Sequence, residues 1–198
     1  TALSILVNAP LLERANPNQT PNPSKAPWYF LNLQEMLLHM DAGLAGVIVP
    51  TVVLVAIAAI PYIDRSPLGV GILGTSTKGR KIIGFSAVYT TVVLIGMILL
   101  DEAIGRGTQF GIGSYLMDEL GVPEFVTGVL LSSIIMIIPI IALVVIVNAM
   151  FRPTRREVII ALFTGFFVAY WVLAISGTSF RGPGQELMWP WDLPLEHH

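Results

Sequence analysis

Four long runs of residues without a single charged side chain place the tightest limit on how this chain folds. The runs are 42–63, 82–100, 125–151 and 158–180. At a rise of about 1.5 Å per residue, a helix of such a length crosses a hydrocarbon core of about 30 Å. Lipid offers the backbone no hydrogen-bond partners, and the runs are too long for barrel strands, so each is predicted to be a helix. The expected fold is an all-α membrane bundle of four spans.

The composition supports a membrane protein and excludes several other classes. The chain is 54% hydrophobic and 12% charged, whereas an average soluble domain is roughly 25% charged. A net charge of −2 gives no basic surface for nucleic acid. The absence of cysteine excludes disulfides, cysteine-ligated iron–sulfur clusters and thioether-linked haem on this chain.

Shorter patterns divide the chain into three parts, namely 1–41, the four-span domain 42–180 and the tail 181–198. Residues 28–40 alternate apolar and polar side chains and predict a helix in the membrane interface. Residues 115–120 predict a second short surface helix. Pro50 and Pro139 lie inside spans, where neighbouring helices tolerate a kink, so we interpret them as packing features. Trp189 and Trp191 suit a membrane-interface belt.

The distribution of basic residues predicts the orientation of the bundle. Seven of them gather in the two loops 64–81 and 152–157, which the predicted spans place on one side of the membrane: Arg65, Lys78, Arg80, Lys81, Arg152, Arg155 and Arg156. The positive-inside rule makes that side cytoplasmic. Segment 1–41, the acidic connection 101–124 and the tail then lie on the outer, positive side, so both termini are expected outside.

The segment in front of the first span reads Ala26-Pro27-Trp28-Tyr29. It resembles the quinol-oxidation loop of cytochrome b, where the family has Pro-Glu-Trp-Tyr. The run 8–25 before it, the stretch 61–65 and the tail 177–191 are also similar to the C-terminal half of cytochrome b. With the resemblance concentrated at 8–65 and 152–191, the second and third spans read as an insertion or as extra helices, and residues 1–7 as the end of a preceding span.

This resemblance implies a subunit IV-like chain of a membrane quinol:cytochrome c-type oxidoreductase, active only within the complex. The implied partners are a diheme cytochrome b N-terminal subunit, a Rieske-type iron–sulfur protein and a c-type cytochrome. The implied location is a prokaryotic inner membrane, and quinone or quinol would bind at a subunit interface.

Haem b in this family takes paired histidines from two facing helices. The chain has three histidines, His39, His197 and His198, and none lies in a span. We therefore expect no haem or metal on this chain and haem b on a partner. His39 is more often a hydrogen-bonded surface residue than a ligand, and His197 and His198 read equally as native or as the remnant of a tag.

Quinol oxidation needs an apolar wall, hydrogen-bond partners and a proton acceptor. Trp28, Tyr29 and Phe30 can form the wall beside Pro27, which has neither a carboxylate nor a backbone donor. Glu35 follows Trp28 by seven residues, which places both on one helix face. Partial burial is expected to raise its pKa toward neutrality and suit it for proton uptake.

Glu35 is thus the favoured catalytic residue, with Tyr29 and then His39 as weaker candidates. The alternative, weighted equally, is that Glu35 is a solvated carboxylate and that a partner protein takes the proton.

Two other functions compete with quinol oxidation as explanations of the sequence. A transporter usually has ionisable residues at mid-membrane depth, and the four spans contain none. A structural anchor for another electron-transfer complex, without quinol chemistry of its own, stays open. A pocket beside Trp28 that opens to lipid favours the quinol site, and its absence favours the anchor.

Overall fold

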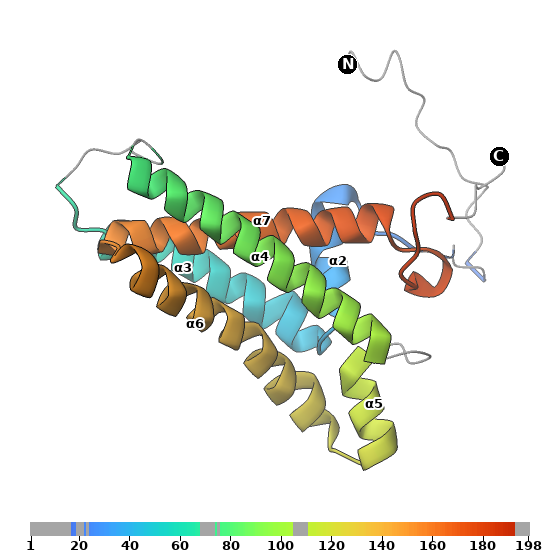
Figure 1. Cartoon of the computed structure of the whole chain (residues 1–198). Coiled ribbons are helices and arrows are strands. Elements are labelled where there is room, and N and C mark those ends of the chain that lie inside the picture. The colour runs from blue at the N-terminus through green and yellow to red at the C-terminus, as the bar shows by residue number, and fades with distance from the viewer. Residues whose placement is uncertain are drawn as a thin grey trace, which may run out of the picture.

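The computed structural model describes residues 17–18, 22, 24–67, 74, 76–104 and 111–192, without the side chains of Gly111 and Ser114. These residues form helices and connecting segments with no β-strand among them (Figure 1). The all-α prediction is confirmed. Segment 1–16, with the predicted end of a preceding span, and His197 and His198 lie outside the described residues.

Four helices are long and apolar enough to cross a membrane, as predicted: Leu44–Ile63, Thr77–Ile104, Phe125–Phe151 and Arg155–Ser179. Their α-helical parts are α3 (Val49–Ile63), α4 (Thr77–Ile104), α6 (Ser132–Phe151) and α7 (Arg155–Ser179). α4 extends beyond the predicted 82–100 at both ends, because the charged residues that flank the apolar run continue the same helix. A helix does not need to stop where the hydrocarbon stops.

Shorter helices flank the spans, and one of them is a 3₁₀ turn after α7, Pro183–Gln185. The predicted interfacial helix 28–40 consists of a 3₁₀ turn, Trp28–Phe30, followed by α2 (Leu31–Leu37). The second predicted surface helix is part of α5 (Gly111–Leu120). The first and third spans both begin with a π-helical turn, Leu44–Ile48 and Phe125–Leu131.

α7 is the central helix, and it packs against α4, α6 and α2 (Figure 1). Where it passes α4 and α6, a Cβ on Gly165 would lie 3.1 Å from Thr90 Oγ1 and 3.3 Å from Leu143 Cδ2. A side chain at this position would therefore press on both neighbours, so glycine suits this close approach. The buried core beside this crossing combines residues of the same three helices: Ile82, Leu143, Val147 and Ala161.

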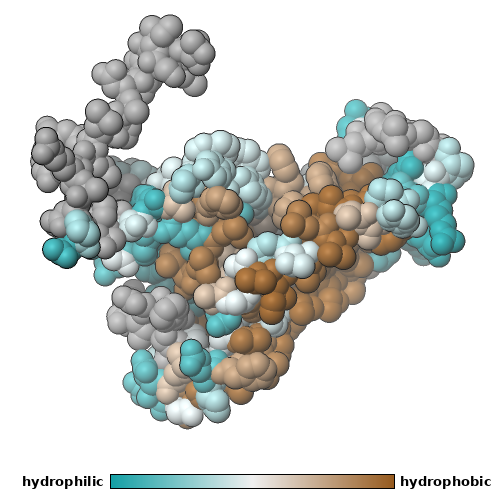
Figure 2. Space-filling view, turned by 180° about the vertical axis from the view of Figure 1, so that it is seen from behind, coloured by the Kyte–Doolittle hydropathy of each residue, from teal (hydrophilic) through white to brown (hydrophobic). Residues whose placement is uncertain are grey.

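The outside of the bundle is mostly apolar. Figure 2 shows a broad hydrophobic band with hydrophilic surface gathered toward the ends of the molecule. α3 is an extreme case, since none of its residues from Val49 to Ile63 is buried. Pro139, inside α6, accepts a hydrogen bond on its carbonyl from Tyr89 Oη at 3.0 Å, a packing contact between α6 and α4.

The two predicted basic loops meet at one end of the bundle, which we call the basic end. Lys78 Nζ on α4 donates to Arg152 O at 2.9 Å and pairs with Glu157 Oε2 on α7 at 3.0 Å. Arg156 on α7 pairs with Asp64, just after α3, at 2.7 Å. The opposite end, which carries α2 and the C-terminal ends of α4 and α7, is called the α2 end.

Candidate functional site

α2 is docked closely on the last turn of α7. A Cβ on Gly177 would lie 3.1 Å from the carbonyl oxygen of Leu31, so a larger residue would push the two backbones apart by a few tenths of an ångström. One residue earlier, Ser176 Oγ donates a hydrogen bond to Glu35 Oε1 at 2.9 Å. The face of α2 that carries Leu31 and Glu35 therefore points at α7.

A buried arginine from the chain just after α7 holds the Glu35 carboxylate. Arg181 donates from Nη2 to Glu35 Oε1 at 2.7 Å and from Nε to Oε2 at 3.0 Å. The two residues are 2% and 1% exposed. Arg181 Nη1 also donates to Glu102 Oε2 on α4 and to Gln185 O, each at 3.0 Å. This fork joins α2, α4 and the tail in one contact.

His39 extends the contact to α4 and α5. Its Nδ1 pairs with Asp101 Oδ2 at 2.5 Å, and its Nε2 lies 3.5 Å from Glu35 Oε1. The other oxygen of Asp101 accepts the backbone N–H of Ile112 at 2.8 Å. We call Glu35, His39, Asp101, Glu102 and Arg181 the Arg181 network.

The network keeps its two central groups ionised. Burial opposes the charge on Glu35, but hydrogen bonds from His39 and Arg181 outweigh it and lower the pKa of Glu35 to about 2. Burial also opposes the charge on His39, yet its hydrogen bonds to Asp101 and Glu35 raise its pKa to about 9. The expectation that burial raises the pKa of Glu35 toward neutrality is wrong, because Arg181 and His39 were not foreseen as its partners.

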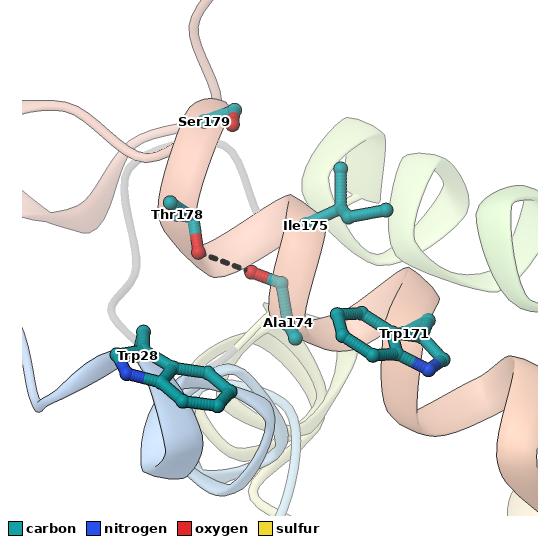
Figure 3. Close-up of a pocket in the computed structure, with 6 residues that line it drawn as sticks. All are labelled: Trp28, Trp171, Ala174, Ile175, Thr178 and Ser179. Atoms are coloured by element: carbon teal, nitrogen blue, oxygen red, sulfur yellow. Dashed lines mark hydrogen bonds between the residues drawn. The ribbon is translucent and has the colours of Figure 1, made fainter. Parts of the chain in front are cut away.

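A pocket of about 210 Å³ lies beside α2, between the turn that carries Trp28 and the outer face of α7 (Figure 3). Its lining residues are Trp28, Trp171, Ala174, Ile175, Thr178 and Ser179. An apolar cavity of roughly 150 Å³ can hold a benzene ring. This pocket is therefore large enough for a single six-membered aromatic ring.

The segment before Trp28 is tied to the same end of α7. Lys25 Nζ donates to Thr178 O at 3.0 Å, and Gln34 on α2 accepts the Ala26 N–H at 2.6 Å and donates to Ser24 O at 2.7 Å. These bonds fix where the chain enters the turn that carries Trp28.

Of the predicted binding residues, the structure brings Trp28 to the pocket. The Tyr29 ring meets the Trp28 ring edge-on, with ring centroids 5.7 Å apart, and the Phe30 ring lies tilted against Tyr29, with centroids 4.9 Å apart. Tyr29 and Phe30 are both about half exposed. Pro27 is exposed and, like them, does not line the pocket. Glu35 is turned away from it toward Arg181.

Sequence reasoning missed Trp171, Thr178 and Arg181. Only Arg181 carried a usable signal. It is the one basic residue in 181–198, it follows an apolar span directly, and Glu35 is the one acidic residue in 26–40. A lone cation and a lone anion at the same membrane interface are candidates for pairing.

The fold and the pocket define the class of this chain as a multi-pass helical membrane protein with a small apolar site at one end of the bundle. The family model described as Cytochrome b(C-terminal)/b6/petD matches residues 14–116. This is just over half of the chain, so the chain belongs to the cytochrome b C-terminal family. Searches of curated proteins and of solved structures give no match.

The matched region corrects one prediction and sets the context of the site. It runs from the Trp28 loop through 82–100, so the second span belongs to the matched region and is not an insertion. The family indicates a subunit of a cytochrome b6f/bc-type electron-transfer complex, in which haem b is present and the N-terminal part of cytochrome b and other subunits are partners.

Proposed function

We propose that this chain forms one wall of a quinol-oxidation pocket on the outer, positive side of the membrane. It works within a quinol:cytochrome c-type oxidoreductase and is inactive alone. Trp28 and the outer face of α7 cover the quinol ring, and a partner subunit closes the pocket.

The pocket beside Trp28 is the observation that carries this proposal. Trp171 and Ile175 are exposed apolar side chains of a spanning helix, so the pocket faces the region that lipid occupies. A lipid-soluble quinol approaches from that region. A pure anchor for another electron-transfer complex has no need of such a cavity, so the pocket supports the quinol site over the anchor.

The charge distribution supports the proposed side of the membrane. The seven basic residues of loops 64–81 and 152–157 belong to the basic end, opposite the pocket. By the positive-inside rule those loops are cytoplasmic in a prokaryotic inner membrane. Protons released at the α2 end then leave on the outer side.

The residues of this chain do not fit haem b, which needs two facing axial histidines. The spans contain no histidine, and both ring nitrogens of His39 already face carboxylates. We therefore assign haem b to a diheme cytochrome b N-terminal subunit. A Rieske-type iron–sulfur protein and a c-type cytochrome receive the other electron in this proposal.

The role of Glu35 follows from its pairing. A carboxylate with a lowered pKa, held by Arg181 and Ser176, takes up a proton poorly at neutral pH. We assign it to positioning α2, and proton uptake to a partner or to solvent. Tyr29, half exposed next to Trp28, remains the catalytic candidate in this chain, as a hydrogen-bond partner for one quinol hydroxyl once the pocket is closed.

The test is Trp28→Ala in the assembled complex, with the Kd of a quinol-site inhibitor as the readout. Loss of an aromatic wall is expected to weaken binding on the order of tenfold, since such ring contacts contribute about 0.5–1.5 kcal/mol beyond their buried area. Trp191→Ala is the matched control, because Trp191 is an exposed indole stacked on Trp189 that does not line the pocket. An unchanged Kd for Trp28→Ala would contradict the proposal.

A further inference from the structure

The pocket is almost entirely apolar, and its hydroxyl groups come from Thr178 and Ser179 at the end of α7. The Thr178 hydroxyl is turned back along its own helix (Figure 3). Its Oγ1 donates a hydrogen bond to the carbonyl oxygen of Ala174 at 2.6 Å. A threonine hydroxyl has one proton and two lone pairs. The hydroxyl proton of Thr178 is therefore already used in the bond to Ala174. Its oxygen can act toward a ligand only as a hydrogen-bond acceptor.

An acceptor-only group distinguishes ligands by their donors. A hydroquinone carries two O–H donors, whereas the corresponding quinone carries only carbonyl acceptors. A quinone oxygen that faced the Thr178 lone pairs would gain no hydrogen bond and would lose its bond to water on entering the pocket. A hydroquinone hydroxyl at the same place gains a bond.

We infer that Thr178 makes this pocket selective for quinol over quinone by accepting a hydrogen bond from one hydroxyl of the reduced ring. This inference rests on the proposed function and adds a residue that sets its specificity. Substrate is favoured for entry and the oxidised product for release.

The surroundings of Thr178 keep its hydroxyl in this state. Its backbone carbonyl is one of the unpaired acceptors at a helix end, and Lys25 Nζ satisfies it at 3.0 Å. The Ala174 carbonyl stays in place because Ala174 is buried within α7. Thr178 lines the pocket, and its Oγ1 stays bonded to the Ala174 carbonyl. Ser179 can rotate its hydroxyl to donate or accept, so it does not discriminate between the two forms.

The experiment compares Thr178→Val, Thr178→Ser and Thr164→Val in the purified complex. Valine keeps the shape and removes the acceptor, and serine keeps the acceptor. Thr164 is a matched control on the same helix, since its Oγ1 also donates four residues back, to Ile160 O at 2.7 Å, away from the pocket. The readouts are the KM for a short-chain quinol and the inhibition constant Ki of its quinone.

For Thr178→Val we expect the quinol KM to rise by about three- to tenfold, the effect of one neutral hydrogen bond, while the quinone Ki stays the same or falls. Thr178→Ser and Thr164→Val should match the wild type. If KM and Ki move together, or neither moves, the inference is overturned. If Trp28→Ala also leaves inhibitor binding unchanged, as it would with a lipid acyl chain in the pocket, the proposed function fails with it.

Discussion

The two ends of the bundle use ion pairs in different ways. At the basic end, Lys78 and Glu157 pair with side chains that are 40% and 16% exposed. At the α2 end, Arg181 and Glu35 pair with side chains that are 3% and 0% exposed. The first pair attaches α7 to α4, and the second attaches the chain just after α7 to α2. The first pair is partly open to water, and the second is almost closed to it.

This difference in burial decides what each pair contributes. Exposed ion pairs stabilise a fold by about 0–1 kcal/mol, because water and salt screen them. Removing one partner of a buried pair costs about 3–5 kcal/mol, because the other charge stays buried without compensation. Charge pairing therefore determines whether α2 stays attached at the α2 end. At the basic end it adds only a small stabilisation.

The largest effect is expected for Arg181→Met. It leaves the Glu35 carboxylate buried against Ser176 and His39 alone, so α2 should detach from α7 and Trp28 should leave the pocket. We expect destabilisation by about 3–5 kcal/mol and cleavage within 28–40 by a protease that leaves the wild type intact. Denaturant unfolding in detergent and limited proteolysis measure these two results.

Two companion variants sharpen this result. Arg181→Lys keeps the charge but loses the two-pronged geometry, so it should fall between the wild type and Arg181→Met. The double variant Glu35→Leu with Arg181→Met removes both charges and should recover part of the loss. A double variant no better than Arg181→Met would show that the uncompensated charge is not the cause.

A smaller effect is expected from pH. The pKa of His39 is raised from 6.5 to about 9, so the stability that it contributes is complete below pH 6.5 and is lost as pH rises through 9. The pKa of Glu35 is lowered from 4.5 to about 2, so its contribution is complete above pH 4.5 and is lost as pH falls toward 2. Attachment of α2 should be strongest between pH 4.5 and pH 6.5, where both contributions are complete.

The measurement is the Tm of the complex from pH 6 to pH 10 for the wild type and for His39→Gln. The variant should be less stable at pH 6 and should lose less stability on the way to pH 10. Parallel curves would remove His39 from the coupling.

The smallest effect is expected for Lys78→Met at the basic end. It removes the pair with Glu157 and the bond to Arg152 O, both on a partly exposed surface. Unfolding should shift by about 1 kcal/mol or less, and the shift should shrink further in high salt. If Lys78→Met lowered the free energy of unfolding as much as Arg181→Met, the two ends would not differ in how strongly their ion pairs stabilise the fold.

The spans could be predicted from the sequence because a fixed membrane thickness and the cost of a charge in lipid leave few choices. The start and end of α4 were missed, since charged residues outside the lipid continue a helix freely. The spacing from Trp28 to Glu35 predicted that the two share one helix face, but Trp28 belongs to the turn before α2 and lines the pocket, whereas Glu35 is buried on the other side against Arg181. The spacing carried no information on what Glu35 packs against, and the partner, Arg181, lies 146 residues away.

Only one side of the pocket could be predicted from the sequence, because sequence spacing does not show which distant residues pack together. Trp28 was recognisable because it belongs to a motif. Trp171 and Thr178 are ordinary residues of an apolar helix, and only the docking of α2 at Gly177 turns them into a wall.

α3 offers a practical route to the neighbours of this chain in the membrane. None of its residues between Val49 and Ile63 is buried by the rest of the chain, and the sequence contains no cysteine. A single thiol at Leu54, which is 68% exposed, would be unique in the chain and would disturb no internal packing. Crosslinks formed there would report directly on the lipid or subunit that lies alongside α3.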